Sequence, residues 1–184
     1  YAPGTDTEGK LVAAAKRLGF DGVYDMNLTA DLTILEEATE FLDRFTNKKN
    51  LPLMTSCSPG WVKFCEHYFP EFTDNLSTCK SPQQMFGAMY KTYYAKKAGL
   101  DPADIVFVSA IPCTAKKFEC RRPDQSAAGN GIFDVDYAIT TRELARMIER
   151  SGIDYRTLPD EKYDAPFDIG SGAGAIFGAT GGVM

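Results

Sequence analysis

The feature that most constrains the fold of this chain is a nearly continuous apolar run at its centre, DIVFVSAI at residues 104–111. A strand that is apolar on both faces needs cover on both faces, which is typical of parallel sheets that lie between layers of helices. Extended and helical patterns alternate along the remainder of the 184 residues. The sequence therefore predicts an α/β fold with a twisted, mostly parallel sheet flanked by helices.

The other expected elements follow from periodicity and capping residues. Further strands are predicted at DGVYDM (21–26), LPLMTS (51–56) and VDYAIT (135–140). Helices are predicted over residues 5–18, 31–45, 59–68, 81–99 and 141–152. The charged, proline-containing stretch 154–167 is expected at the surface, before a segment with six glycines in fifteen residues.

Composition excludes several classes of protein. With 44% hydrophobic and 24% charged residues, the chain is typical of a soluble globular protein. A net charge of −5 argues against nucleic acid as a main partner. No apolar run approaches the roughly 20 residues that cross a bilayer, so no membrane span is expected. The start of the chain has no basic region followed by an apolar stretch, so no signal peptide is predicted.

Two of the five cysteines, Cys57 and Cys113, directly follow predicted strands. Ligands of open α/β sheets gather at the carboxyl ends of strands, and Lys116 and Lys117 would favour a thiolate at Cys113. The odd number of cysteines argues against a disulfide scaffold and for a reducing compartment. The remaining thiols are expected in the core or in loops, and the one histidine at a helix end: Cys65, Cys79, Cys120 and His67.

Three segments resemble signatures of the catalytic domain of iron-only hydrogenases: TSCSPGW (55–61), SPQQMFG (81–87) and IPCTAKKFE (111–119). DLTILEEATE, TTRELARMI and SGAGAIFGATGG are similar to the same family, in the same order. The resemblance implies reversible reduction of protons to hydrogen at a six-iron centre. In that centre a cysteine bridges a 4Fe-4S cubane to a two-iron subcluster that carries CO, cyanide and a dithiolate amine (the H-cluster).

The resemblance also implies the organisation and the partners of the chain. Residues 1–150 would form most of a first lobe, and residues 151–184 would be a loop and the glycine-rich start of a second lobe. Electrons would come from ferredoxin or a similar carrier, and maturation proteins would supply the cluster. The expected compartment is the cytoplasm, or the periplasm if a signal segment precedes these residues.

Several cofactor contacts are implied by the resemblance. Cys113 matches a cubane ligand, and Lys116 matches a lysine that donates a hydrogen bond to cyanide. The other matching positions belong to the shell and the walls of the cofactor pocket: Ser81, Gln83, Ile111, Pro112, Phe177 and Gly178. At position 111 the family usually has methionine, so the isoleucine removes a thioether contact.

A proton relay is implied as well, through Cys57, Glu119, Ser77, Glu37 and Glu40, with Arg44 at its outer end. From the residues alone, Glu37, Glu40 and Arg44 share one helix face. The same spacing is also typical of an exposed charged helix face. From the sequence alone, Glu119 is equally well explained as a surface acid beside Lys116.

The chain departs from the family at two points. Ser58 occupies a position that usually holds a cubane cysteine. Ser58 or water would complete that site, or Cys57 would become the ligand, or the cluster would be altered. The other two cubane cysteines of the family lie in a C-terminal signature that these 184 residues lack. The remainder of the same chain, or a partner chain, would have to supply them.

Three functions follow from the resemblance. The first is a hydrogenase. The second is a sensory relative that reports hydrogen or redox state without turnover. The changes at positions 58 and 111 are compatible with it, but the complete set of relay residues argues for turnover. The third is an iron–sulfur cluster scaffold or assembly protein of the same superfamily. The presence of Lys116 and Gln83 favours a two-iron unit over this third function.

Overall fold

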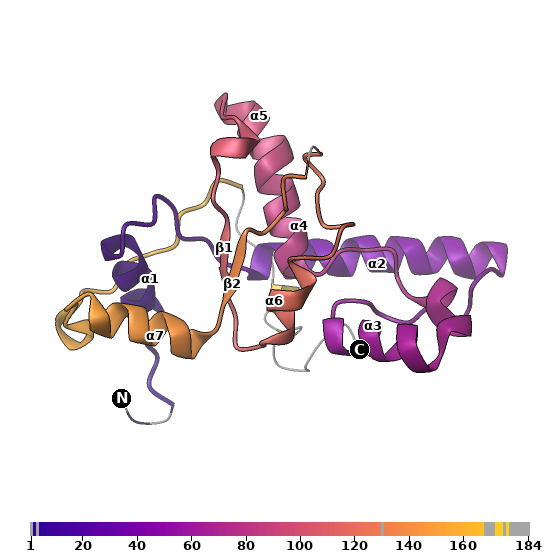
Figure 1. Ribbon diagram of the computed structural model, residues 1–184, viewed down its shortest axis with the longest axis horizontal. Helices are drawn as coiled ribbons and strands as arrows, with labels where there is room; N and C mark the ends of the chain where they lie inside the picture. The colour runs from indigo at the N-terminus through magenta and orange to yellow at the C-terminus, as the bar shows by residue number, and fades with distance from the viewer. Residues whose placement is uncertain (1, 3, 130, 168–171, 175, 177–184) are drawn as a thin grey trace.

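The computed structural model describes residues 2, 4–129, 131–167, 172–174 and 176. Helices dominate it (Figure 1). In chain order the α-helices are α1 (Glu8–Arg17), α2 (Asn27–Asn47), α3 (Pro59–Tyr68), α4 (Pro82–Met89), α5 (Ala95–Ala98), α6 (Ala115–Glu119) and α7 (Thr141–Arg150). Shorter turns of helix are η1 (Pro70–Asn75), η2 (Tyr90–Tyr94), η3 (Pro102–Asp104) and η4 (Tyr155–Thr157).

The described sheet has two parallel strands, β1 (Val108–Ala110) and β2 (Tyr137–Ile139). Ile111 N extends the ladder by donating to Ile139 O at 2.9 Å. Helix α6 lies on the connection between the strands, which confirms the expected class of helices combined with a parallel sheet. The sheet lies at the centre of the molecule, with α1 and α7 on one side and α2 and α3 on the other (Figure 1).

The sheet is smaller than predicted because two expected strands find partners in loops. In the segment 21–26, Val23 N donates to the carboxylate of Asp164 at 2.9 Å and Val23 O accepts from Asp164 N at 2.8 Å. In the segment 51–56, only Met54 pairs, as an isolated parallel bridge with Leu76. The prediction of regular strands at these two places is therefore wrong.

The predicted helices are confirmed, with shifted ends. The helix over residues 81–99 runs through α4, a π-helical turn at η2 and α5, and it ends at Gly99, whose φ of +70° favours glycine. In the middle of that run, a Cβ at Gly87 would collide with the carbonyl of Asp134, so glycine allows the close approach. Helix α7 begins at a capping box formed by Thr140 and Glu143.

Two apolar clusters form the core. One joins α1 to α7, and its buried members are Ala13, Ala14, Leu144, Ile148 and Leu158. The other lies between α4 and the sheet, and its buried members are Phe86, Phe107, Cys120, Val135 and Ala138. Of the three thiols expected in the core or in loops, Cys65 and Cys120 are buried and Cys79 is half-buried.

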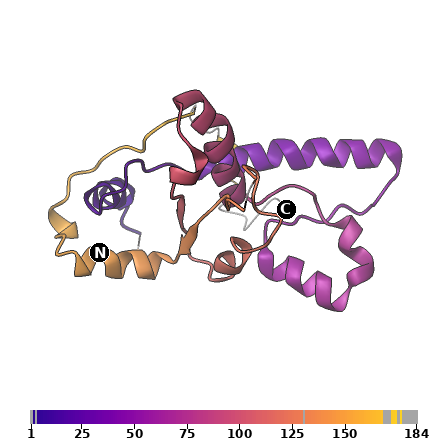
Figure 2. The same ribbon diagram turned by 45° about the horizontal axis from the view of Figure 1, so that its top comes forward.

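Helix α2 has an unusual distribution of side chains. It extends along one side of the molecule above α3 (Figures 1 and 2). Its buried positions are mostly polar or charged, namely Thr29, Ala30, Thr33, Glu37 and Arg44. Four of its large apolar side chains are exposed, with fractions from 44% to 65%: Leu35, Phe41, Leu42 and Phe45. Along the described part of the chain, no helix combines the length and the apolar character that a membrane span requires.

Candidate functional site

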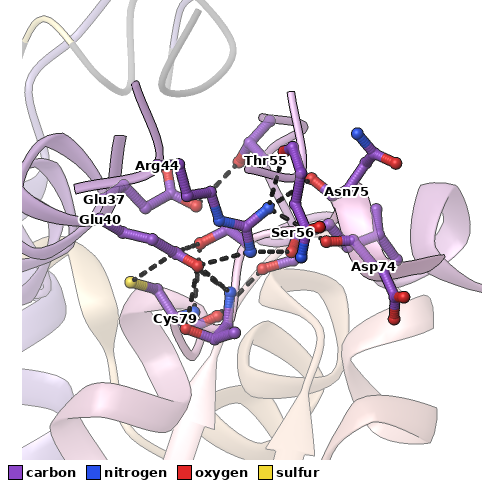
Figure 3. A network of polar contacts seen from close by, with 12 residues as sticks. Glu37, Glu40, Arg44, Thr55, Ser56, Asp74, Asn75 and Cys79 are labelled. Carbon is purple, nitrogen blue, oxygen red and sulfur yellow. Dashed lines mark hydrogen bonds and ion pairs between the residues drawn. The ribbon is translucent and has the colours of Figure 1, made fainter. Parts of the chain in front are cut away.

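Glu40 is the centre of a polar network between α2 and the two segments 50–57 and 74–79 (Figure 3). Arg44 donates to it from one helical turn away at 2.7 Å, and Ser77 Oγ donates at 2.7 Å. Both the N–H and the hydroxyl of Thr78 donate to it at 3.1 Å. Burial alone would raise the pKa of Glu40, but hydrogen bonds from Ser77, Thr78 and Arg44 outweigh it and hold the pKa below its ordinary value of 4.5.

Arg44 fixes the loops that carry this network. Its guanidinium donates to four backbone carbonyl groups at 2.8–3.3 Å, those of Asn50, Asp74, Asn75 and Leu76. A planar group with five donors suits such a cluster of acceptors. Arg44 is therefore a structural clamp as well as the partner of Glu40.

Glu37, one turn before Glu40 on the same side of α2, is buried and makes fewer contacts. Thr55 Oγ1 lies 3.3 Å from its Oε1. Burial raises the pKa of Glu37 above 4.5, and hydrogen bonds from Ser77 and Thr55 offset this only in part. The two glutamates of α2 thus differ, because burial favours the protonated form of Glu37 and the donors around Glu40 favour its carboxylate.

Thr55 connects this network to Cys57. Its hydroxyl lies 3.5 Å from Cys57 Sγ as well as 3.3 Å from Glu37 Oε1. A hydroxyl both donates and accepts, so it can bridge a thiol and a carboxyl group. Thr55 stands inside the TSCSPGW segment, and its place two residues before Cys57 on an extended segment is the signal that could have indicated this contact.

Ser58, which matches a cubane ligand by resemblance, forms the N-cap of α3. Its Oγ accepts from Trp61 N at 3.5 Å, with Pro59 at the first helical position. The preceding carbonyl, Cys57 O, accepts from Lys116 Nζ at 2.6 Å. The start of α3 is therefore attached to α6 through Lys116.

A second polar network surrounds α6. We call it the closed set, because its side chains, Lys116, Glu119, Ser81 and Gln83, contact mainly one another. Lys116 and Glu119 form an ion pair at 3.2 Å with exposed side-chain fractions of 9% and 7%. Ser81 Oγ and Gln83 Nε2, at the start of α4, donate to Glu119 Oε2 at 2.9 and 2.8 Å. In the described part of the chain, the buried Oε1 of Gln83 has no partner.

The structure separates Glu119 from the other predicted relay residues. Its carboxylate is held by Ser81, Gln83 and Lys116, and in the described part of the chain it makes no hydrogen bond with Ser77 or Glu37. Lys116, three residues before it on α6, is its counter-charge. The expected order, with Glu119 between Cys57 and Ser77, is not joined by direct hydrogen bonds among the described residues and stays a prediction.

Cys79 is a loop thiol, as expected, and it also joins the α2 network. Its Sγ lies 3.7 Å from Glu40 Oε2, and its N–H donates to Ser77 Oγ at 3.1 Å. Burial raises the pKa of the Cys79 thiol to about 11, so it remains a thiol that donates. Nothing in the sequence near Cys79 indicated this contact, which depends on a helix almost forty residues earlier.

Three of the residues expected at the cofactor, Ile111, Pro112 and Cys113, lie on the turn between β1 and α6. Cys113 is exposed and free, Pro112 is exposed and Ile111 is half-buried. Phe177 and Gly178 lie outside the described residues. An exposed thiol beside Lys116 fits one ligand position of a metal cluster. Within the described ranges, no three histidine, cysteine or acidic side chains gather as a metal site, so this donor set fits only part of a cubane.

Comparison with known proteins identifies the family. The model of the iron-only hydrogenase large subunit, C-terminal domain, matches residues 1–184. The chain belongs to the iron-only hydrogenase family. Solved structures agree, since the apo [FeFe]-hydrogenase HydA1 of Chlamydomonas reinhardtii, variant C377H, superposes with a TM-score of 0.87 at 43% identity. That match covers 100% of this chain and 46% of the hydrogenase.

The similar proteins include hydrogenases and cytosolic iron-sulfur assembly components. The chain is 56% identical to the NADP-reducing hydrogenase subunit HndD of Solidesulfovibrio fructosivorans, covering 100% of this chain and 32% of that protein. It is 37% identical to the cytosolic iron-sulfur assembly component 3 of Pongo abelii, covering 93% of this chain and 36% of that protein. The chain thus spans about a third of the length of these two relatives.

Proposed function

We propose that this chain is the part of an iron-only hydrogenase that carries protons to the metal centre during the reversible reduction of protons to hydrogen. The observation that supports this most is the row of hydrogen-bonding groups from Arg44 to Cys57. Arg44, Glu40 and Ser77 follow one another at 2.7 Å, and Glu37, Thr55 and Cys57 follow at 3.3 and 3.5 Å. Ser77 also lowers the pKa of Glu37, so it interacts with both carboxyl groups.

The two glutamates have complementary properties for this role. The Glu40 carboxylate, on the outer side, releases a proton readily, because hydrogen bonds from Ser77, Thr78 and Arg44 lower its pKa. Glu37, on the inner side, holds a proton more readily because burial raises its pKa. A proton would pass from Glu40 through the Ser77 hydroxyl to Glu37, and then through Thr55 to the Cys57 thiol. Proton transfer needs groups within such distances.

The metal centre would lie beyond Cys57. Cys113 would supply one ligand, and Ser58 or Cys57 a second. Lys116, with Gln83 and Ser81 behind it, would face the small ligands of the two-iron unit, and Ile111 and Pro112 would exclude water. When bound, the cubane and its CO- and cyanide-bearing two-iron unit would supply the redox chemistry. Ferredoxin or a similar carrier, maturation proteins and the remaining cubane ligands are proposed as partners, and the cytoplasm as the compartment.

The test uses the full-length protein produced together with hydrogenase maturation proteins. Iron content, CO and cyanide infrared bands and hydrogen evolution are measured. Glu37→Gln and Thr55→Val should keep the bands and lower turnover about 10²- to 10⁴-fold, as loss of a proton donor does. Glu36→Gln, at the exposed neighbouring position of α2, is the matched control and should keep full turnover. Full activity of Glu37→Gln would contradict the proposed path.

A second candidate is an iron–sulfur scaffold or assembly protein, which the similarity to cytosolic iron-sulfur assembly component 3 favours. Such a protein would bind a cubane without the two-iron unit. Four irons with no CO or cyanide bands would establish it in place of the hydrogenase, and bands without turnover would instead indicate a sensor. In all three cases Cys113→Ala should lower the iron content.

A further inference from the structure

The ion pair of α6 indicates a role for Glu119 that differs from proton transfer. Lys116 Nζ lies 3.3 Å from Glu119 Oε1 and 3.2 Å from Oε2, and both side chains are buried. A buried charge is tolerated when its partner and its hydrogen bonds are in place. The surroundings of each partner show what the pair holds in position.

The carboxylate of Glu119 is fixed from outside its own helix. Three donors converge on Oε2, because Ser81 Oγ and Gln83 Nε2 add to the Lys116 ammonium group at 2.9 and 2.8 Å. Ser81 and Gln83 belong to the start of α4, so α4 determines the position of this carboxylate on α6. The described contacts of Glu119 are with donors, which hold a carboxylate charged and in place.

The ammonium group of Lys116 is held at two of its three N–H bonds. Cys57 O accepts one at 2.6 Å, and the Glu119 carboxylate accepts another. These two contacts come from opposite chain segments, the start of α3 and the end of α6. With both fixed, the direction of the third N–H bond is also determined.

We propose that Glu119 is a positioning residue: with Ser81 and Gln83, it holds Lys116 so that the remaining N–H of the ammonium group faces a small anionic ligand of the metal centre. This inference rests on the proposed function for the identity of that ligand. The positioning itself depends only on residues of this chain. It can therefore be tested in the protein without its metal centre.

The first experiment measures the rate at which an amine-reactive acetylating reagent labels each lysine of the metal-free full-length protein, with peptide mass spectrometry as the readout. Glu119→Gln should accelerate labelling of Lys116 about tenfold or more, since a charged hydrogen bond is lost. Labelling of Lys117 should stay unchanged. An unchanged rate at Lys116 would overturn the proposal.

Two further variants separate positioning from general damage. Glu119→Asp retains the carboxylate and should restore most of the protection of Lys116. Lys117 lies beside Lys116 on α6 and pairs at 2.6 Å with Glu143 of α7, and the side chains of this pair are exposed. Glu143→Gln removes that partner and should leave Lys116 protected. If Glu119→Gln does not fold, Gln83→Leu tests the same point, because it removes a donor to Glu119 and should also accelerate labelling of Lys116. Protection that survives this change would contradict the role of α4.

The second experiment compares infrared bands of the loaded enzyme. If Glu119 positions Lys116, Glu119→Gln should shift the cyanide bands in the same direction as Lys116→Met. A proton relay would leave the bands in place and lower only turnover, which would overturn the proposal. If the unaltered protein shows no cyanide bands, the proposed function fails, and the labelling experiment still decides whether Glu119 positions Lys116.

Discussion

Glu40 and Glu119 each pair with a basic residue on the same helix, but their surroundings differ. Glu40 and Arg44 belong to a network with Ser77, which also lowers the pKa of Glu37, and Thr55 donates to Glu37. Glu119 and Lys116 belong to a closed set in which Ser81 and Gln83 supply the remaining donors. The two ion pairs thus have similar spacing but different neighbours, because Glu37, whose pKa is raised by burial, lies near one of them and the donors Ser81 and Gln83 lie beside the other.

The largest expected effect on stability comes from removing the charge of Lys116 from the closed set around Glu119. Lys116→Met leaves the Glu119 carboxylate buried without its counter-charge and should destabilise the protein by about 3–5 kcal/mol. Denaturant unfolding of the metal-free protein measures this. In the double variant Lys116→Met/Glu119→Met most of the loss should be recovered, because no unpaired charge remains. A double variant as unstable as the single one would show that packing, rather than charge, sets the cost.

Glu40→Gln should have the next largest effect, a loss of about 2–3 kcal/mol at neutral pH, since hydrogen bonds to a charged group are replaced by weaker ones. Folding lowers the pKa of Glu40, so its contribution is present above 4.5 and is lost as the pH falls through the lowered pKa. The variant should therefore approach the parent in stability toward acidic pH. An equal difference at all pH values would contradict the lowered pKa.

Glu37→Gln should act in the opposite direction. Folding raises the pKa of Glu37, so the stability that this group contributes is complete below 4.5 and is lost as the pH rises through the raised pKa. Glutamine does not ionise, so the variant does not lose this stability. It should therefore be more stable than the parent at pH values above the raised pKa of Glu37. Unfolding measured at a series of pH values checks the sign. If stability falls in parallel with that of Glu40→Gln, the two carboxyl groups do not differ as inferred.

Thr55→Val should have the smallest effect on stability, about 1 kcal/mol, because one neutral hydroxyl is removed at nearly constant volume. Since Thr55 lowers the pKa of Glu37, that pKa should rise further in the variant, which a ¹³C NMR titration of the Glu37 carboxyl carbon would detect. Thr55→Ser retains the hydroxyl and should keep the parent pKa. If the pKa of Glu37 does not change in Thr55→Val, the Thr55 hydroxyl is not part of the proposed proton path.

Local signals in the sequence predicted the helices well. Ser81 and Pro82 indicate the start of α4, and Thr140 with Glu143 indicates the start of α7. The strands at 21–26 and 51–56 were predicted wrongly because their hydrogen bonds go to loops, at Asp164 and at Leu76. Local patterns do not report partners so far along the chain.

In the candidate site, too, some features could be predicted from local sequence and others could not. The shared face of Glu37, Glu40 and Arg44 follows from helical spacing, and the structure confirms that all three lie on the inner side of α2. The surroundings of Glu119 could not be predicted, because its donors Ser81 and Gln83 come from another helix. The roles that the resemblance assigns to these residues, including the place of Glu119 in the relay, stay predictions.

The polar inner side of α2 has a consequence for the order of folding. Helix α2 packs on α4, and at Glu40 and Arg44 it is held by hydrogen bonds to the segments 50–57 and 74–79. Those bonds form only after the two segments have reached their places. Substitutions at Glu40 and Arg44 should therefore have φ-values near zero, and they should accelerate unfolding while leaving the rate of folding nearly unchanged.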